Sequence, residues 1–196
     1  MGLRIVIASD SRGYSPIKYN WVKILSRNLR KEGYTVNSNI GWNRSGKSKG
    51  TKIRIVTVYS ILQQLQEDNQ YYDMGIIQCG IHDRVLEWTT SVWKFILPPR
   101  EFDKSKFVKM GNRSEFSGLY DDDDIIREYF QKIRKYVNYI IVIGMHSFKK
   151  HADKKRRMCH KNILKMNNLY SECSDYFVAL PLNWHWIKKT RGYLEK

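Results

Sequence analysis

Small polar motifs follow four apolar runs of the sequence, and their residue types suit ester chemistry. They are SDS at residues 9–11, SGKS at 45–48, GIHD at 80–83 and LNWH at 182–185. If Ser11 and His185 meet, the histidine can take the serine proton as a general base and make the hydroxyl a nucleophile. Glycine backbone and a side-chain donor such as His82 can then stabilise the oxyanion of an acyl-transfer intermediate. The pattern therefore indicates serine-dependent acyl-ester chemistry.

A parallel α/β sheet would bring these four motifs to one place. Runs rich in Ile, Val, Tyr and Phe are typical of buried strands, and they occupy residues 5–8, 34–37, 72–79, 137–144 and 175–182. Helical patterns lie between them, which indicates a parallel sheet covered on both faces. We therefore expect an α/β fold, a three-layer α/β/α sandwich around a central parallel sheet of about five strands. Ligands and catalytic groups collect at the carboxyl ends of such strands.

Local signals position the first two expected helices. Ser15 can cap a helix that begins at Pro16 and ends at Gly33. Its apolar face comprises Trp21, Leu25 and Leu29. A second helix is expected over residues 52–66, where one apolar stripe holds Ile55, Tyr59 and Leu62.

The second half of the chain is expected to hold three more helices and one insertion. Acidic residues 121–124 predict the first turn of a helix whose apolar face extends to Val137, with a metal site as the alternative. Two further helical patterns cover residues 161–172 and 186–195. Residues 84–120 form a long aromatic and basic insertion after the third strand, and connections of this length usually serve a function.

The order and strand context of the motifs resemble the SGNH (GDSL-type) hydrolase family, whose fold is a flavodoxin-like α/β/α sandwich. The family's first block, G-D-S, is matched by SDS, in which Ser9 replaces the glycine. The resemblance implies that Ser11 is the nucleophile and that its own N–H is an oxyanion donor. Gly46 matches the glycine of the second block, S-G-x-T/S, and would supply a second donor.

The third and fourth family blocks are altered. The third, G-x-N-D, reads GIHD, so His82 takes the place of the oxyanion asparagine. An imidazole N–H can donate as an amide does, but its charge depends on pH. In the fourth block, D-x-x-H, His185 matches the base and Leu182 replaces the aspartate. A backbone carbonyl, Asn183 or a carboxylate from elsewhere could orient the histidine. The supporting residues are then Asp10, Asp83 and Asn183.

The resemblance implies a serine-dependent esterase that works through an acyl-enzyme. We expect its substrate to be an acyl ester, such as the O-acetyl ester of a carbohydrate, because aromatic residues in the insertion, Trp88 and Trp93, can stack on sugar rings. Two alternatives stay open. One is an O-acyltransferase on the same scaffold in polysaccharide biosynthesis, and the other is a pseudoenzyme that binds a polyanion.

Composition bounds the location and partners of the protein. The net charge of +16 over 196 residues favours polyanions, and the densest basic run, at 149–161, could lie in one loop. Four of its residues are candidate polyanion contacts: Lys154, Lys155, Arg156 and Arg157.

No apolar run approaches the roughly 20 residues of a membrane span, and no secretory signal is visible. We expect a single cytoplasmic domain over residues 1–196. The three cysteines lack the paired spacing of zinc ligands, so we expect no metal or other cofactor.

Overall fold

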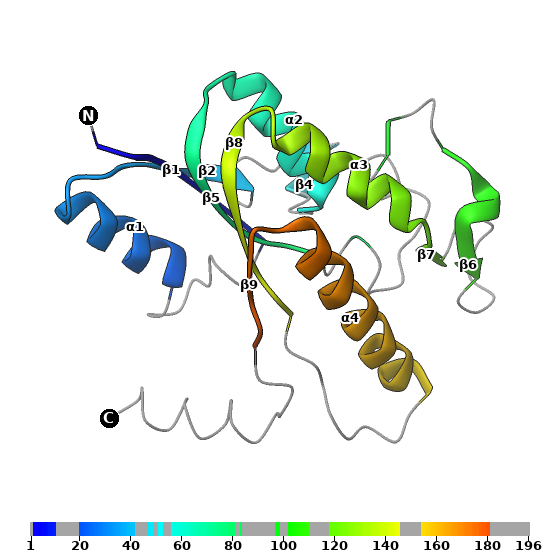
Figure 1. The fold of residues 1–196 in the computed structure, drawn as a ribbon. Coiled ribbons are helices and arrows are strands. Elements are labelled where there is room, and N and C mark those ends of the chain that lie inside the picture. The colour runs from blue at the N-terminus through cyan, green and yellow to red at the C-terminus, as the bar shows by residue number, and fades with distance from the viewer. Residues whose placement is uncertain are drawn as a thin grey trace.

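The protein is built on a five-stranded parallel sheet (Figure 1). The computed structural model describes residues 2–10, 20–41, 47–48, 51–52, 56–80, 83, 97–98, 102–109, 118–145 and 154–180. The strands are β1 (Arg4–Ser9), β2 (Thr35–Gly41), β5 (Tyr72–Gln78), β8 (Val137–Ile143) and β9 (Tyr176–Val178). They lie in the order β2-β1-β5-β8-β9, and every neighbouring pair is parallel. This is the flavodoxin-like strand order, and it confirms the expected fold class.

Helices cover both faces of this sheet. Helix α1 (Trp21–Lys31) packs on one face, and α2 (Val58–Asp68), α3 (Asp123–Ile133) and α4 (Lys154–Cys173) pack on the other (Figure 1). Strand β1 alternates between the two cores: Val6 and Ala8 join the cluster under α2, α3 and α4, whereas Ile5 and Ile7 join the cluster under α1. A strand buried on both faces needs apolar residues at every position, which explains the continuous run at 5–8.

Short antiparallel pairs occur outside the main sheet. Strands β3 (Lys47–Ser48) and β4 (Thr51–Lys52) pair with each other, so the second half of the SGKS motif is strand. The insertion at 84–120 contains a 3₁₀ helix, η5 (Lys104–Lys106), and the pair β6 (Phe107–Lys109) and β7 (Gly118–Tyr120). The Phe107 ring packs edge-on against Tyr120 with 5.0 Å between centroids. The described part of the insertion is therefore tied together by its aromatic residues.

Three expected element boundaries were wrong. Helix α1 begins at Trp21 with Asn20 as its cap, whose side chain accepts from the Lys23 N–H, while Ser15 and Pro16 lie outside the described residues. Helix α2 begins at Val58 and not at residue 52, because Thr57 and Ser60 form a capping box there. Val137 is the first residue of β8 and does not extend the face of α3.

Helix α4 also begins earlier than expected. The sequence indicated a helix over 161–172 after a basic loop, but the helix starts at Lys154 and takes in the residues numbered 154–157. The one-loop interpretation of the basic run was therefore wrong, and polyanion contact through these residues stays a prediction. The helix expected at 186–195 lies outside the described residues. Within the described part of the chain, no helix is both long and apolar enough to cross a membrane.

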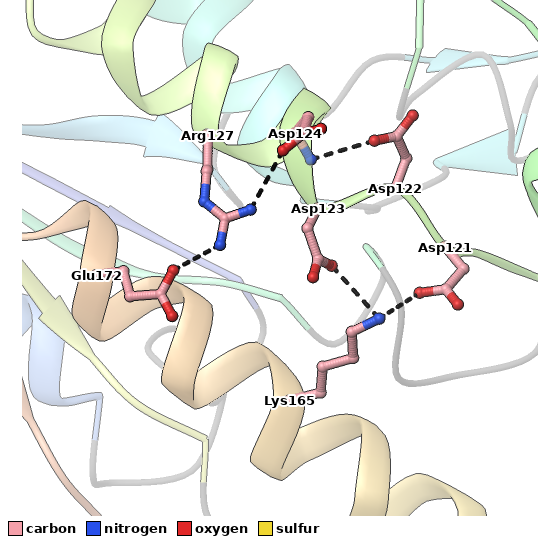
Figure 2. A network of polar contacts seen from close by, with 7 residues as sticks. All are labelled: Asp121, Asp122, Asp123, Asp124, Arg127, Lys165 and Glu172. Atoms are coloured by element: carbon pink, nitrogen blue, oxygen red, sulfur yellow. Dashed lines mark hydrogen bonds and ion pairs between the residues drawn. The ribbon is translucent and has the colours of Figure 1, made fainter.

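The acidic run at 121–124 forms the start of α3 and links it to α4 (Figure 2). Asp122 is the N-cap, and its side chain accepts from the Asp124 N–H at 3.1 Å. The Lys165 ammonium lies 2.8 Å from an Asp121 carboxylate oxygen and 3.5 Å from one of Asp123. Arg127 bridges Asp124 and Glu172 at 3.3 and 2.6 Å. These contacts confirm the helix interpretation, and among the described residues no cluster of acidic, histidine or cysteine side chains is arranged to hold a metal ion.

Candidate active site

The ends of three strands meet where the strand order reverses. Strand β1 lies between β2 and β5, and its last residue, Ser9, is in register with Gly41 of β2 and Gln78 of β5. In open α/β sheets, ligands bind outside the carboxyl ends of the strands at such a switch point. Ser11 follows Ser9 by two residues, and the GIHD motif begins two residues after Gln78. The topology therefore directs the candidate site to this edge.

Buried polar side chains concentrate at the same edge. Eight polar or charged side chains are buried among the described residues, and seven of them lie at the strand ends or in the first two turns of α2. These seven are Ser9, Asp10, Thr57, Ser60, Gln64, Gln78 and Asp83, and the exception is Ser26 in α1. Burying a polar group is unfavourable unless it is hydrogen-bonded. Among the described residues, the carboxyl edge is therefore where most of the buried polar side chains gather.

Hydrogen bonds fix the chain just before Ser11. The Asp10 N–H donates to the Gln78 carbonyl at 3.0 Å, which extends the pairing of β1 and β5 by one residue. The Gln78 side-chain oxygen accepts from the Trp21 indole N–H at 3.0 Å and from the Ser9 hydroxyl at 3.4 Å. Asp10 itself is fully buried. These hydrogen bonds therefore fix Ser9 and Asp10, the two residues that precede Ser11 in the sequence.

The amino end of α2 lies at this edge as well. Gly41, the last residue of β2, donates its N–H to the Gln64 side-chain oxygen at 2.9 Å. The Thr57 hydroxyl accepts from the Ser60 N–H at 3.1 Å, and the Ser60 hydroxyl accepts from the Thr57 N–H at 2.9 Å. The positive end of the helix dipole consequently faces the strand ends.

Asp83 is buried against this helix end. One of its carboxylate oxygens accepts from the Val58 N–H at 3.0 Å, and the other accepts from the Tyr170 hydroxyl at 3.3 Å. Only 1% of Asp83 is exposed. A helix N-terminus favours a negative charge, so the location stabilises the buried carboxylate. The sequence singled out Asp83, but it gave no indication of Tyr170, which belongs to α4 and follows Asp83 by 87 residues.

The structure describes two of the predicted site residues, Asp10 and Asp83, and brings both to the carboxyl edge. The other predicted site residues lie outside the described part of the chain: Ser11, Gly46, His82, Trp88, Trp93, Asn183 and His185, together with Leu182. Their roles stay predictions. The edge itself is defined by the described ends of the parallel strands that precede them.

The fold is shared with solved carbohydrate esterases. An acetylxylan esterase from Geobacillus stearothermophilus is 17% identical, with a TM-score of 0.54, over 96% of this chain and 81% of the esterase. A variant of an acetyl xylan esterase from the same organism gives 18% identity and the same TM-score and coverage. No protein-family model matches the sequence, and no curated protein matches it either. At these identities the likeness concerns the fold: this chain has the α/β architecture of those esterases.

Proposed function

We propose that the protein is a serine-dependent esterase that removes an acetyl group from a carbohydrate through an acyl-enzyme. The observation that carries the proposal is the set of buried polar side chains at the switch point of the sheet, directly before Ser11. The fold shared with acetylxylan esterases supports the same assignment. Polar side chains at one edge of an apolar sheet can hold a nucleophile by hydrogen bonds and leave it accessible to the substrate.

In the first half of the reaction, the Ser11 hydroxyl oxygen attacks the ester carbonyl carbon. His185 takes the hydroxyl proton as the new C–O bond forms. The carbonyl oxygen becomes an oxyanion, which accepts hydrogen bonds from the N–H groups of Ser11 and Gly46 and from the His82 ring. When the intermediate collapses, the sugar oxygen leaves with the proton from His185, and the acetyl group stays on the serine.

In the second half, water attacks the acetyl-serine. His185 takes a proton from the water, the same donors hold the second oxyanion, and the serine oxygen leaves with that proton. Acetate is the product. Replacement of the water by a second sugar hydroxyl would give transfer in place of hydrolysis, so product analysis distinguishes the esterase from the acyltransferase.

A carbohydrate substrate agrees with two features. Acetylxylan is the substrate named for the solved structures with this fold. Trp88 and Trp93 belong to the insertion that follows β5, and indole faces stack well on sugar rings. Because β5 ends at the candidate site, an insertion that starts there is suited to bind the sugar beside the scissile ester.

The test is ester turnover with matched serine variants. Wild type, Ser11→Ala and Ser26→Ala would be assayed for acetate release from 4-nitrophenyl acetate and from acetylated xylo-oligosaccharides. Ser26 is a buried serine of α1 whose hydroxyl donates to the Val22 carbonyl at 2.6 Å, so its variant controls for loss of a structural hydroxyl. We expect Ser11→Ala to lose nearly all turnover and Ser26→Ala to keep it. Equal turnover of Ser11→Ala and wild type would refute the proposal.

A further inference from the structure

The GIHD segment is anchored at both of its ends. The Asp83 N–H donates to the Gly80 carbonyl at 3.2 Å, so the chain turns back between these two described residues. Gly80 has a φ of +110°, a backbone conformation that favours glycine. The two ends of the segment that carries the proposed oxyanion donor are therefore tied to each other.

One side chain contacts both ends of this turn. The Tyr170 hydroxyl donates to the Asp83 carboxylate at 3.3 Å and lies 3.6 Å from the Cys79 thiol sulfur. At Gly80, an added Cβ atom would lie only 2.7 Å from the Tyr170 hydroxyl oxygen. Tyr170 is fully buried, and its ring packs edge-on against Phe130 of α3 at 5.5 Å between centroids. A rigidly held hydroxyl thus fills the space against the Gly80 backbone.

The same turn is held from a third element. The Asp83 carboxylate accepts from the Val58 N–H at the start of α2, so Val58, Asp83 and Tyr170 form one hydrogen-bonded chain from α2 to α4. A buried carboxylate that loses one of its donors moves or recruits water, because an unpaired buried charge is strongly unfavourable. Loss of the tyrosine hydroxyl would therefore remove one of the donors that hold Asp83 next to Gly80.

We propose that Tyr170 is a positioning residue of the active site, which holds Gly80 and Asp83, the two residues that flank Ile81 and His82 in the sequence, in place for oxyanion binding. The inference rests on the proposed function and assigns a role to a residue of α4 outside the family motifs. Its effect on the reaction is indirect, through the turn, so it should appear in kcat and leave KM nearly unchanged.

The test uses a matched pair of tyrosine variants. Tyr170→Phe keeps the ring and removes the hydroxyl. Tyr72→Phe is the control, because the buried Tyr72 hydroxyl also donates to an aspartate, Asp68, but at the amino end of β5. Two readouts are taken: kcat and KM for 4-nitrophenyl acetate, and hydrogen exchange of the Val58 and Asp83 amides by NMR.

In Tyr170→Phe, we expect exchange of the Val58 and Asp83 amides to rise about tenfold, as loss of one hydrogen bond to a charged group allows. We expect kcat to fall about tenfold, less than the roughly 10² to 10³ of deleting an oxyanion donor outright. Tyr72→Phe should change neither quantity. Asp83→Asn gives a second route: its effect on kcat combined with Tyr170→Phe should be smaller than the product of the two, because both act through one contact.

The outcomes separate the two proposals. Unchanged exchange of the two amides in Tyr170→Phe overturns the inference, and so does faster exchange with an unchanged kcat. Equal losses of kcat in Tyr170→Phe and Tyr72→Phe also overturn it, since general destabilisation would then be the cause. A wild type without ester turnover overturns the proposed function. In that case, faster exchange of the Val58 and Asp83 amides in Tyr170→Phe would still show that Tyr170 holds Asp83 in place.

Discussion

The two ends of strand β5 each carry a tyrosine–aspartate hydrogen bond, and helix α2 runs between them. At the amino end of β5, the Tyr72 hydroxyl donates to Asp68, the last residue of α2, and accepts from the Asn37 amide at 2.6 Å. At the carboxyl end, Tyr170 donates to Asp83, which accepts from the first N–H of the same helix. Asp68 is half-buried, whereas Asp83 is almost fully buried.

The helix dipole explains this difference. A carboxylate is unfavourable at the C-terminus of a helix, so Asp68 keeps part of its hydration and relies on Tyr72. At the N-terminus the dipole and the free N–H groups compensate a negative charge, so Asp83 can lose its water. Among the described residues, the carboxyl edge therefore stabilises the buried carboxylate of Asp83. An oxyanion formed during ester cleavage has the same requirement.

The largest expected effect is loss of His185, the general base of the proposed mechanism. His185→Ala should lower kcat by about 10⁴-fold or more, because serine and histidine act as a unit. Its melting temperature should stay close to that of wild type. A steady-state assay with 4-nitrophenyl acetate measures the loss. Turnover within a few-fold of wild type would remove His185 from the mechanism.

Substitutions of two glycines, one at each edge of the sheet, compare the edges by their effect on the free energy of unfolding. Gly80 and Gly33 both have positive φ, +110° and +88°, but Gly33 lies before β2 at the amino edge and has open space where a Cβ would be added. Gly33→Ala should cost about 1 to 2 kcal/mol from backbone strain alone. Gly80→Ala adds a clash with Tyr170 and should cost about 3 kcal/mol or more. Urea unfolding measures both, and equal costs would contradict the close packing at Gly80.

The hydrogen-bonded pair Tyr72 and Asp68 at the amino edge should make the stability of the protein depend on pH in alkali. Burial, and next the hydrogen bond with Asp68, raise the pKa of Tyr72 above its ordinary value of 10.0. Its stabilising contribution is complete below about pH 10 and is lost as pH rises through the raised pKa, since the folded state then holds a proton that the unfolded chain has released. Wild type should therefore lose more stability between pH 9 and 11 than Tyr72→Phe does. Parallel stability curves would exclude this contribution.

The smallest expected effect concerns a second carboxylate at the amino edge. Burial alone would raise the pKa of Asp175, but hydrogen bonds from Arg134 and from the Ile140 N–H lower it below 3.8. Its contribution is present above that pH and is lost as pH falls through the lowered pKa. Asp175→Asn should reduce the free energy of unfolding at pH 7 by about 1 kcal/mol or less, since the pair is partly exposed. The difference from wild type should shrink in acid unfolding at about pH 2.

The sequence predicted the sheet well because its central strands, β1 and β5, are largely buried and read as nearly continuous apolar runs. The apolar runs that became β1, β5 and β8 need no knowledge of their neighbours to be recognised. The start of α4 was missed for an electrostatic reason. Four cations at residues 154–157 oppose the dipole of a helix that begins there, and packing of the later turns through Ile163 and Met166 outweighs them.

Candidate site residues were predictable only where a motif carries them. Asp83 stands in the GIHD motif beside a strand end, so the sequence indicated it. Tyr170 lies on the buried face of α4 with Ile163 and Met166, where a tyrosine is typical of core packing. Nothing in its local sequence says that its hydroxyl meets Asp83, which is 87 residues away along the chain. Contacts of that kind come from topology, not from local pattern.

The most direct test of the account is to identify the nucleophile by covalent labelling. A fluorophosphonate probe reacts with an activated serine, and trypsin would release the peptide 5–12, which contains both Ser9 and Ser11. Fragment-ion mass spectrometry then separates the two serines, of which Ser9 is fully buried. We predict that wild type carries the label on Ser11 and that Ser11→Ala carries none. A label on any other residue, or no label on a folded wild type, would contradict a serine esterase centred on the carboxyl edge of the sheet.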